Sequence, residues 1–224
     1  MYSKFLTNVA MTAAVVMSAQ ASAGLMLETY GSGAATPEII GGYAMTDFAV
    51  TNGVGGVSST TTSPLGGSLE FKDHNGDALD MNRGLANSTN WWMNGEATDN
   101  DIFTTGVHWV EIFLPENTRA FSFNVGASFS GRGWLEASED GVHALDRTNF
   151  LVSASNTPGF GIYADNSGGE CGSISSVIID PSQWGVGNFS INQSECVTEV
   201  PEPGALGLIG LGVLGLGLAR RRAS

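Results

Sequence analysis

The spacing of hydrophobic and polar residues predicts β-strands through the middle of the chain. In residues 120–129, Phe, Val and Ala at the odd positions alternate with small or polar residues. A period of two places one set of side chains on each face of a strand, so we expect a half-buried strand here. The glycines of 131–133 then predict a turn, and 134–137 predict a return strand.

Short apolar runs recur along the chain, separated by clusters of Gly, Ser, Asn and Asp. They predict strands in 25–30, 48–51, 67–71, 107–114, 150–154, 159–164, 174–179 and 185–191. Short strands with Gly-rich turns favour an all-β fold. We expect an antiparallel β-sandwich of jelly-roll type, with a β-barrel as the alternative. Residues 31–65, rich in Gly, Ser and Thr, predict a loose edge or loop.

The first 23 residues have the parts of an N-terminal signal peptide. Lys4 supplies a positive start, residues 9–17 form an apolar core, and Ala21-Ser22-Ala23 is a small-residue cleavage site. We therefore expect export by the Sec machinery and a mature chain that begins at Gly24.

The last residues combine two prolines, an apolar run and an arginine cluster. Val200-Pro201-Glu202-Pro203 predicts an extended strip. Residues 204–219 carry no charge, and as a hydrophobic helix they would be about 24 Å long, against roughly 30 Å for a membrane core. The arginines at 220–222 should stay cytoplasmic. A permanent anchor and a removable signal both remain open on these grounds.

The order of these parts, Val200, Pro201, Glu202 and Pro203, then a Gly/Leu-rich run, then Arg220, Arg221 and Arg222, resembles the PEP-CTERM sorting signal of Gram-negative bacteria. The resemblance covers residues 200–224 alone. It implies that an exosortase-type membrane protease recognises the motif and removes the tail. The implied course is an inner-membrane-tethered precursor, inserted transiently through the C-terminal helix, and then the cell surface or extracellular matrix. It implies no activity for the body of the protein.

Residues 24–199 remain between the two signals, and they predict one β-sandwich domain. Four of the 9 Lys and Arg residues and one of the 22 Asp and Glu residues lie in the two ends, which leaves this body at a net charge near −16. That charge argues against nucleic acid and anionic surfaces as partners, and it favours divalent cations or neutral sugars. Acidity for solubility alone is the alternative explanation.

The two cysteines, Cys171 and Cys196, predict one disulfide in an exported chain. The closed loop of about 26 residues would contribute roughly 3 kcal/mol of stability. Two free thiols or a metal pair are the alternatives.

A cluster of acidic and polar residues has the chemistry of a calcium site. Asp73, Asn75, Asp77 and Asp80 place hard oxygen ligands around the turn residue Gly76. The spacing does not match an EF-hand, because the glycine comes too early and residue 84 is not Glu. The cluster therefore predicts either a structural Ca²⁺ clip, as the one cofactor to consider, or an acidic turn that bonds to itself.

Trp91 and Trp92 lie together in a polar stretch and suggest a site for sugar rings. Adjacent side chains of a strand point to opposite faces, so at least one ring should be exposed unless both pack under a loop. No familiar catalytic motif occurs, and we expect no enzyme activity. The sequence thus predicts a non-enzymatic structural or matrix-associated protein; the alternative is a carbohydrate-binding module that contacts extracellular polysaccharide.

Overall fold

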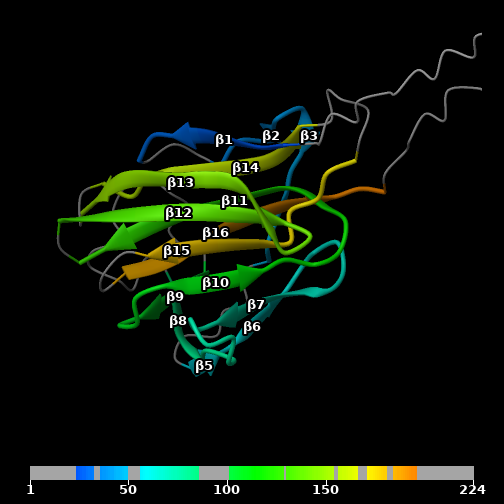
Figure 1. Ribbon diagram of the computed structural model, residues 1–224. Coiled ribbons are helices and arrows are strands. Elements are labelled where there is room, and N and C mark those ends of the chain that lie inside the picture. Colours follow the sequence, from blue (N-terminus) through cyan, green and yellow to red (C-terminus); the bar gives the residue numbers. More distant parts are fainter. Residues whose placement is uncertain are drawn as a thin grey trace, which may run out of the picture.

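The computed structural model describes residues 24–32, 36–49, 56–85, 101–128, 130–153, 156–165, 171–180 and 184–195. Within these residues, two antiparallel sheets pack face to face (Figure 1). This confirms the predicted all-β, jelly-roll-like sandwich. The predicted signal peptide and C-terminal helix lie outside the described residues, so both domain boundaries stay predictions. Within the described ranges, no helix is long and apolar enough to cross a membrane.

The larger sheet has eight strands. Its order is β1 (Gly24–Tyr30), β14 (Gly159–Asp165), β11 (Thr118–Ala127), β16 (Trp184–Gln193), β9 (Asp101–Thr105), β8 (Met81–Leu85) and β5 (Gly56–Ser58), with β4 (Thr46–Asp47) paired to β16. The smaller sheet has six strands. Its order is β13 (Val142–Val152), β12 (Gly131–Glu139), β15 (Ser176–Asp180), β10 (Val110–Phe113), β7 (Ser68–Lys72) and β6 (Thr60–Thr62).

Aromatic side chains from both sheets fill the space between them. Phe71 of the six-stranded sheet lies 4.9 Å from Phe103 of the eight-stranded sheet, measured between ring centroids. Phe189 stacks on Phe121 at 5.6 Å. Phe71, Phe103 and Phe121 are essentially inaccessible to solvent. Such interdigitated rings account for much of the apolar area that the fold removes from water.

A short hairpin of two strands with two residues each, β2 (Ile39–Ile40) and β3 (Tyr43–Ala44), covers part of the outer face of the eight-stranded sheet. Gly41 and Gly42 connect its strands with φ values of 56° and 87°, which suits a tight primed turn. Ile40 is fully buried, and a Cβ built on Gly161 would lie 2.8 Å from its Cδ1 atom. Burial also raises the pKa of Tyr43, whose hydroxyl donates to the Ala164 carbonyl at 3.1 Å.

The structure corrects two expectations. Residues 31–65 were expected to form a loose edge, but they contain β2 to β6, and Ile40 belongs to the buried interior. The strand at 120–129 was expected to be half-buried, but all ten residues of β11 are buried. The alternation correctly places Phe121 and Phe123 in the core. On the polar face of β11, Ser122 bonds to Ser190 and Asn124 accepts from the Tyr30 hydroxyl.

The predicted turn at 131–133 is also wrong. These residues begin β12, and their partners in β13 are residues 150–152. Gly131 and Gly133 suit a turn by composition, but pairing with β13 decides the conformation here. β13 is likewise longer than the run at 150–154 predicted, because its first half alternates with exposed polar residues that carry little apolar signal.

Candidate functional site

A buried arginine, Arg119, lies near the end of the described chain and donates hydrogen bonds to two separate segments. Arg119, at a bulge near the start of β11, is 4% exposed. Its Nε donates to the Ser194 carbonyl at 3.0 Å, and its Nη1 donates to the carbonyls of Cys171 and Gly172. Ser194 also donates its backbone N–H to the Asn117 carbonyl. The guanidinium thus joins the segment before the C-terminal tail to the segment that begins at Cys171.

The predicted disulfide falls on one described and one undescribed residue. Cys171 is not a free thiol. Cys196 lies outside the described residues, so its pairing with Cys171 stays a prediction. Arg119 nevertheless holds residues 171–172 against Ser194, two residues before Cys196.

The loop with the predicted calcium ligands forms a turn organised by Asp73. Its Oδ1 accepts the backbone N–H groups of Asn75 at 2.8 Å and Asp77 at 3.1 Å. The Asn75 N–H is the main cause that lowers the pKa of Asp73 below its ordinary value. Two backbone bonds, Asp73 N–H to Asp77 O and Gly76 N–H to Asp73 O, close the turn. The carboxylate is therefore already used as a turn acceptor.

The described residues hold no group of three His, Cys, Asp or Glu side chains placed to bind a metal ion. Asp73, Asn75 and Asp77 belong to the turn, whereas Asp80 follows the isolated bridge at Ala78. Calcium binding there stays a prediction. Trp91 and Trp92 lie outside the described residues, and a sugar site on them is likewise a prediction.

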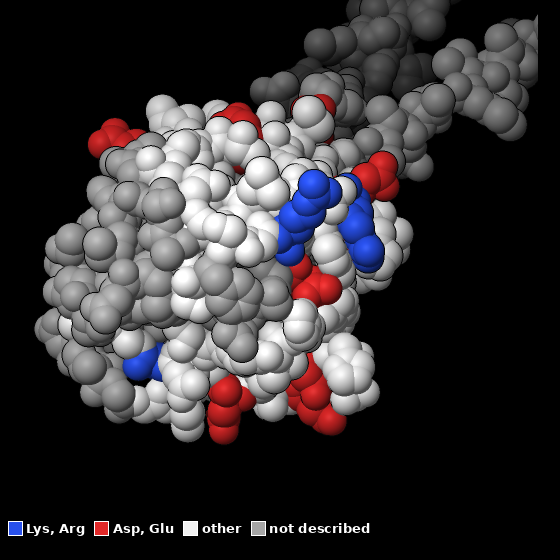
Figure 2. All heavy atoms as spheres, turned by 90° about the vertical axis from the view of Figure 1, so that its left-hand side faces the viewer, with Lys and Arg blue, Asp and Glu red and all other residues white. Residues whose placement is uncertain are grey.

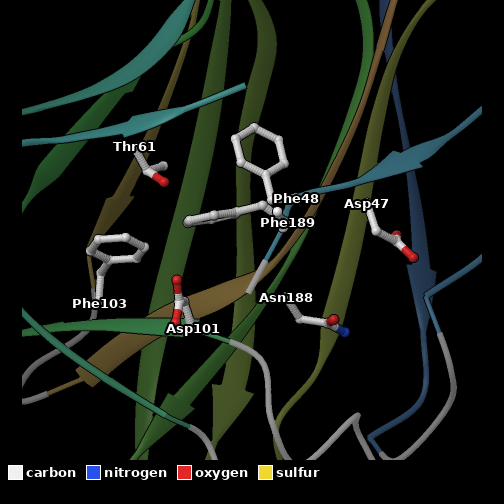
Figure 3. Close-up of a pocket in the computed structure, with 8 residues that line it drawn as sticks. Asp47, Phe48, Thr61, Asp101, Phe103, Asn188 and Phe189 are labelled. Carbon is white, nitrogen blue, oxygen red and sulfur yellow. The ribbon is translucent and has the colours of Figure 1, made fainter. Parts of the chain in front are cut away.

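A small cavity lies where β16 changes partner from β9 to β4 (Figure 3). Asp101, Asn188 and Thr61 line it together with the rings of Phe48, Phe103 and Phe189. Asp101 Oδ2 forms an ion pair with Arg83 at 2.5 Å. The cavity volume of about 20 Å³ is enough for a single water molecule and far too small for a sugar ring.

The outer face of the six-stranded sheet carries a polar cluster that the sequence analysis did not single out. Trp134 of β12 is half-buried, and the Arg147 guanidinium lies 3.7 Å from its ring centroid. Arg147 Nε also donates to Glu136 Oε1 at 2.6 Å. Asp180 pairs with Trp134 across the sheet and lies 3.3 Å from His108 Nδ1. The cluster was missed because its members come from three separate strands and from the segment before β10.

The C-terminal residues that follow the described chain were compared with known families. Residues 199–222 match the PEP-CTERM protein-sorting motif. The match contains all the residues predicted to form the sorting signal, from Val200 to Arg222. The motif indicates an exported protein with a membrane-anchored precursor. It leaves the sandwich domain without a characterised family.

No curated protein matches the chain. Among solved structures, one similar chain is the carbohydrate-binding module CBM6cm-2 of Cellvibrio mixtus lichenase 5A, in complex with cellotriose. The identity is 13%, the match covers 68% of this chain and 98% of that one, and the TM-score is 0.24. Another is a family 11 carbohydrate-binding module from Clostridium thermocellum, in complex with a mixed-linked tetrasaccharide. The identity is 10%, the coverage 67% and 96%, and the TM-score 0.20. TM-scores this low say nothing about a ligand of the present chain.

Proposed function

We propose that this protein is an exported, non-enzymatic sandwich domain that an exosortase-type membrane protease processes at its C-terminal signal. It then serves a structural or matrix-associated role at the cell surface or in the extracellular matrix. The match at residues 199–222 carries the proposal. The fold supports it, because β16 ends at Gln193 and the matched residues begin six positions later. A short connection therefore joins a folded domain to the signal.

Fractionation of the producing cells, followed by intact-mass measurement, tests this proposal. The wild-type chain should reach the surface or matrix fraction with residues 1–23 and the C-terminal tail removed. Replacing Arg220, Arg221 and Arg222 by Gln should leave unprocessed precursor, because the cationic stop fixes the orientation of the membrane segment. Arg132→Gln, an arginine of the body, is the matched control and should be processed normally. Normal processing of the triple variant would contradict the proposal.

Carbohydrate binding is a second candidate function, supported by the cluster around Trp134. Aromatic rings and planar polar side chains suit the apolar faces and hydroxyl groups of sugars. The net charge near −16 of residues 24–199 favours a neutral polysaccharide over an anionic one. Because Arg147 covers one face of Trp134, a sugar ring would have to replace the guanidinium there.

Titration calorimetry with neutral polysaccharides tests this second function. Trp134→Ala should abolish binding, and Tyr43→Ala serves as the control at a half-buried aromatic residue over the other sheet. Loss of binding only in Trp91→Ala or Trp92→Ala would assign the sugar to the predicted loop instead. Absence of binding to every neutral polysaccharide tried would count against the candidate as a whole.

A further inference from the structure

Three exposed apolar side chains surround the end of β16, from which the tail continues. Ile39, Leu65 and Val142 are 63%, 46% and 68% exposed, and we call them the rim. Each side chain belongs to a segment that hydrogen bonds connect to the end of the domain.

Leu65 and Ile39 each lie beside a residue that is hydrogen-bonded to the last strand. Gln193 Nε2 donates to the carbonyl of Gly66, the neighbour of Leu65, at 3.2 Å. Asn192 Nδ2 donates to the Ala44 carbonyl at 2.8 Å, and Ala44 pairs with Ile39 in the β2–β3 hairpin. Figure 1 shows β2 and β3 toward the side of the sandwich on which β16 ends.

Val142 reaches the same end through the β12–β13 turn. The N–H of Gly141 donates to Ser175 Oγ at 3.0 Å, and the adjacent segment at Gly172 is joined to Ser194 by Arg119. Leu151, at the other end of β13, pairs with Arg132 at the start of β12. The two ends of β12 are separated by about 26 Å at the usual rise of a strand. Val142 and Leu151 therefore mark opposite ends of the sandwich.

The connection between the domain and the membrane segment is short. Nine residues lead from Glu195, the last described residue, to Gly204, where the apolar run begins. Fully extended, they reach at most roughly 30 Å. When residues 204–219 are in a membrane, this connection keeps the end of β16, and with it the rim, close to the lipid surface.

The charges beside the rim indicate which lipid surface it fits. Glu38, Glu116, Asp140 and Glu195 are exposed at this end, while Arg119 is buried and bound to carbonyls. Acidic side chains are repelled by anionic lipids. At the opposite end, which Figure 2 faces, basic and acidic side chains lie next to one another. The rim end thus offers apolar contacts without an attraction to anionic headgroups.

We propose that the rim rests on a zwitterionic membrane surface while the chain is tethered, and leaves that surface once the tail is removed. Three separated apolar side chains bind a bilayer weakly, but a tether raises their effective concentration at the surface. Cleavage removes this advantage, so the domain is released. The inference rests on the membrane-anchored precursor of the proposed function.

Methyl NMR of the full chain in phosphatidylcholine nanodiscs tests the proposal, with a paramagnetic chelate on a small share of the headgroups. Val107 lies at the Leu151 end, because its neighbour His108 contacts Asp180, which pairs with Trp134 in the first half of β12. Relaxation of the Ile39, Leu65 and Val142 methyl groups should exceed that of Val107 and Leu151 by at least roughly tenfold, given the strand length that separates the two ends. Adding anionic phosphatidylglycerol should reduce the effect. An increase would overturn the assignment to a zwitterionic surface.

Two matched double variants give the control. Leu65→Ser with Val142→Ser should lower the relaxation at Ile39 severalfold, whereas Leu151→Ser with Val107→Ser should leave it unchanged. Equal relaxation at both ends of an inserted chain would overturn the rim contact alone. If the full chain does not co-purify with nanodiscs, the anchored precursor fails, and the rim contact fails with it.

Discussion

The carboxylate of Asp73 stabilises the turn after β7 by accepting two backbone N–H groups. Folding lowers its pKa from the ordinary 3.8. A lowered pKa means that the turn contributes stability above pH 3.8 and loses it as the pH falls through the folded-state value. We expect Asp73→Ala to lower the melting temperature at pH 7 and to matter progressively less below pH 3.8. Asp80→Ala is the control, and an effect of Asp73→Ala that is independent of pH would contradict the argument.

Calcium can be tested at the same carboxylate. A Ca²⁺ ion that binds only the folded chain must raise its melting temperature. If Asp73, Asn75, Asp77 and Asp80 form a clip, adding Ca²⁺ to chelator-treated protein should raise the melting temperature of the wild type but not of Asp73→Ala. An unchanged wild-type value would eliminate the clip and leave the self-bonded turn.

Arg119 is the residue whose importance the sequence conceals most completely. A single arginine in a β-strand pattern suggests an exposed side chain, but this one is buried and donates to three carbonyls. Arg119→Met should lower the free energy of unfolding by about 2–4 kcal/mol, because the carbonyls lose a charged donor. Urea unfolding measures the change. Arg132→Met, at an exposed position, should stay within about 0.5 kcal/mol. Similar values for the two variants would refute the role assigned to Arg119.

At the level of elements, the β2–β3 hairpin packs on the sheet at Gly161, which has no side chain to displace Ile40. Gly161→Ala would place a Cβ against Ile40 and should cost about 1–2 kcal/mol. Ile40→Ala should cost about 2–4 kcal/mol through the cavity it leaves. The methyl group introduced at Gly161 would meet the Ile40 side chain. The double variant should therefore lower the free energy of unfolding by less than the sum of the two single variants, by more than about 0.5 kcal/mol in urea unfolding. Gly131→Ala, where a Cβ meets nothing, is the control. Strict additivity would show that the hairpin does not rest on this glycine.

Short apolar runs between polar clusters located most strands of both sheets, including β1, β7, β14 and β16. This pattern failed where pairing partners decide the structure. Gly131 to Gly133 have a turn composition, yet they form a strand because β13 lies alongside. The segment before residue 65 has little apolar content. Its strands exist because the β2–β3 hairpin packs at Gly161 and because β4, β5 and β6 pair with β16, β8 and β7. The strand pattern is local, whereas these features depend on long-range contacts.

At the level of the whole molecule, the sorting signal is readable from the sequence because its parts are contiguous and in a fixed order. The Trp134 cluster is not, since β12, β13, β15 and the segment before β10 bring together residues separated by up to 72 positions. The rim is hidden for the same reason. Ile39, Leu65 and Val142 are brought to the end of β16 only through the hydrogen bonds of Asn192, Gln193 and Arg119. Contiguous motifs can therefore be predicted here, and assembled surfaces cannot.

The predicted Cys171–Cys196 disulfide and Arg119 would act on the same two segments, and this makes the disulfide testable in two ways. Replacing both cysteines by Ser should lower the free energy of unfolding by about 3 kcal/mol, because a closed loop is lost from the unfolded chain. Adding a reductant to the wild type should give the same loss, and adding it to the double variant should change nothing. Urea unfolding measures both, and a wild type that is indifferent to reductant would contradict the pairing.

Combining the two cysteine replacements with Arg119→Met tests whether the disulfide and the guanidinium stabilise the same part of the domain. If the disulfide and the guanidinium both hold residues 171–172 against Ser194, losing either one loosens the site of the other. The triple variant should then differ from the sum of its parts by more than about 0.5 kcal/mol. Additive effects would mean that the two ties act on independent parts of the end of the domain. A non-additive result would mean that the disulfide and Arg119 together hold the C-terminal end of the domain, from which the sorting signal continues. A force on the tail before cleavage would then not unfold the sandwich.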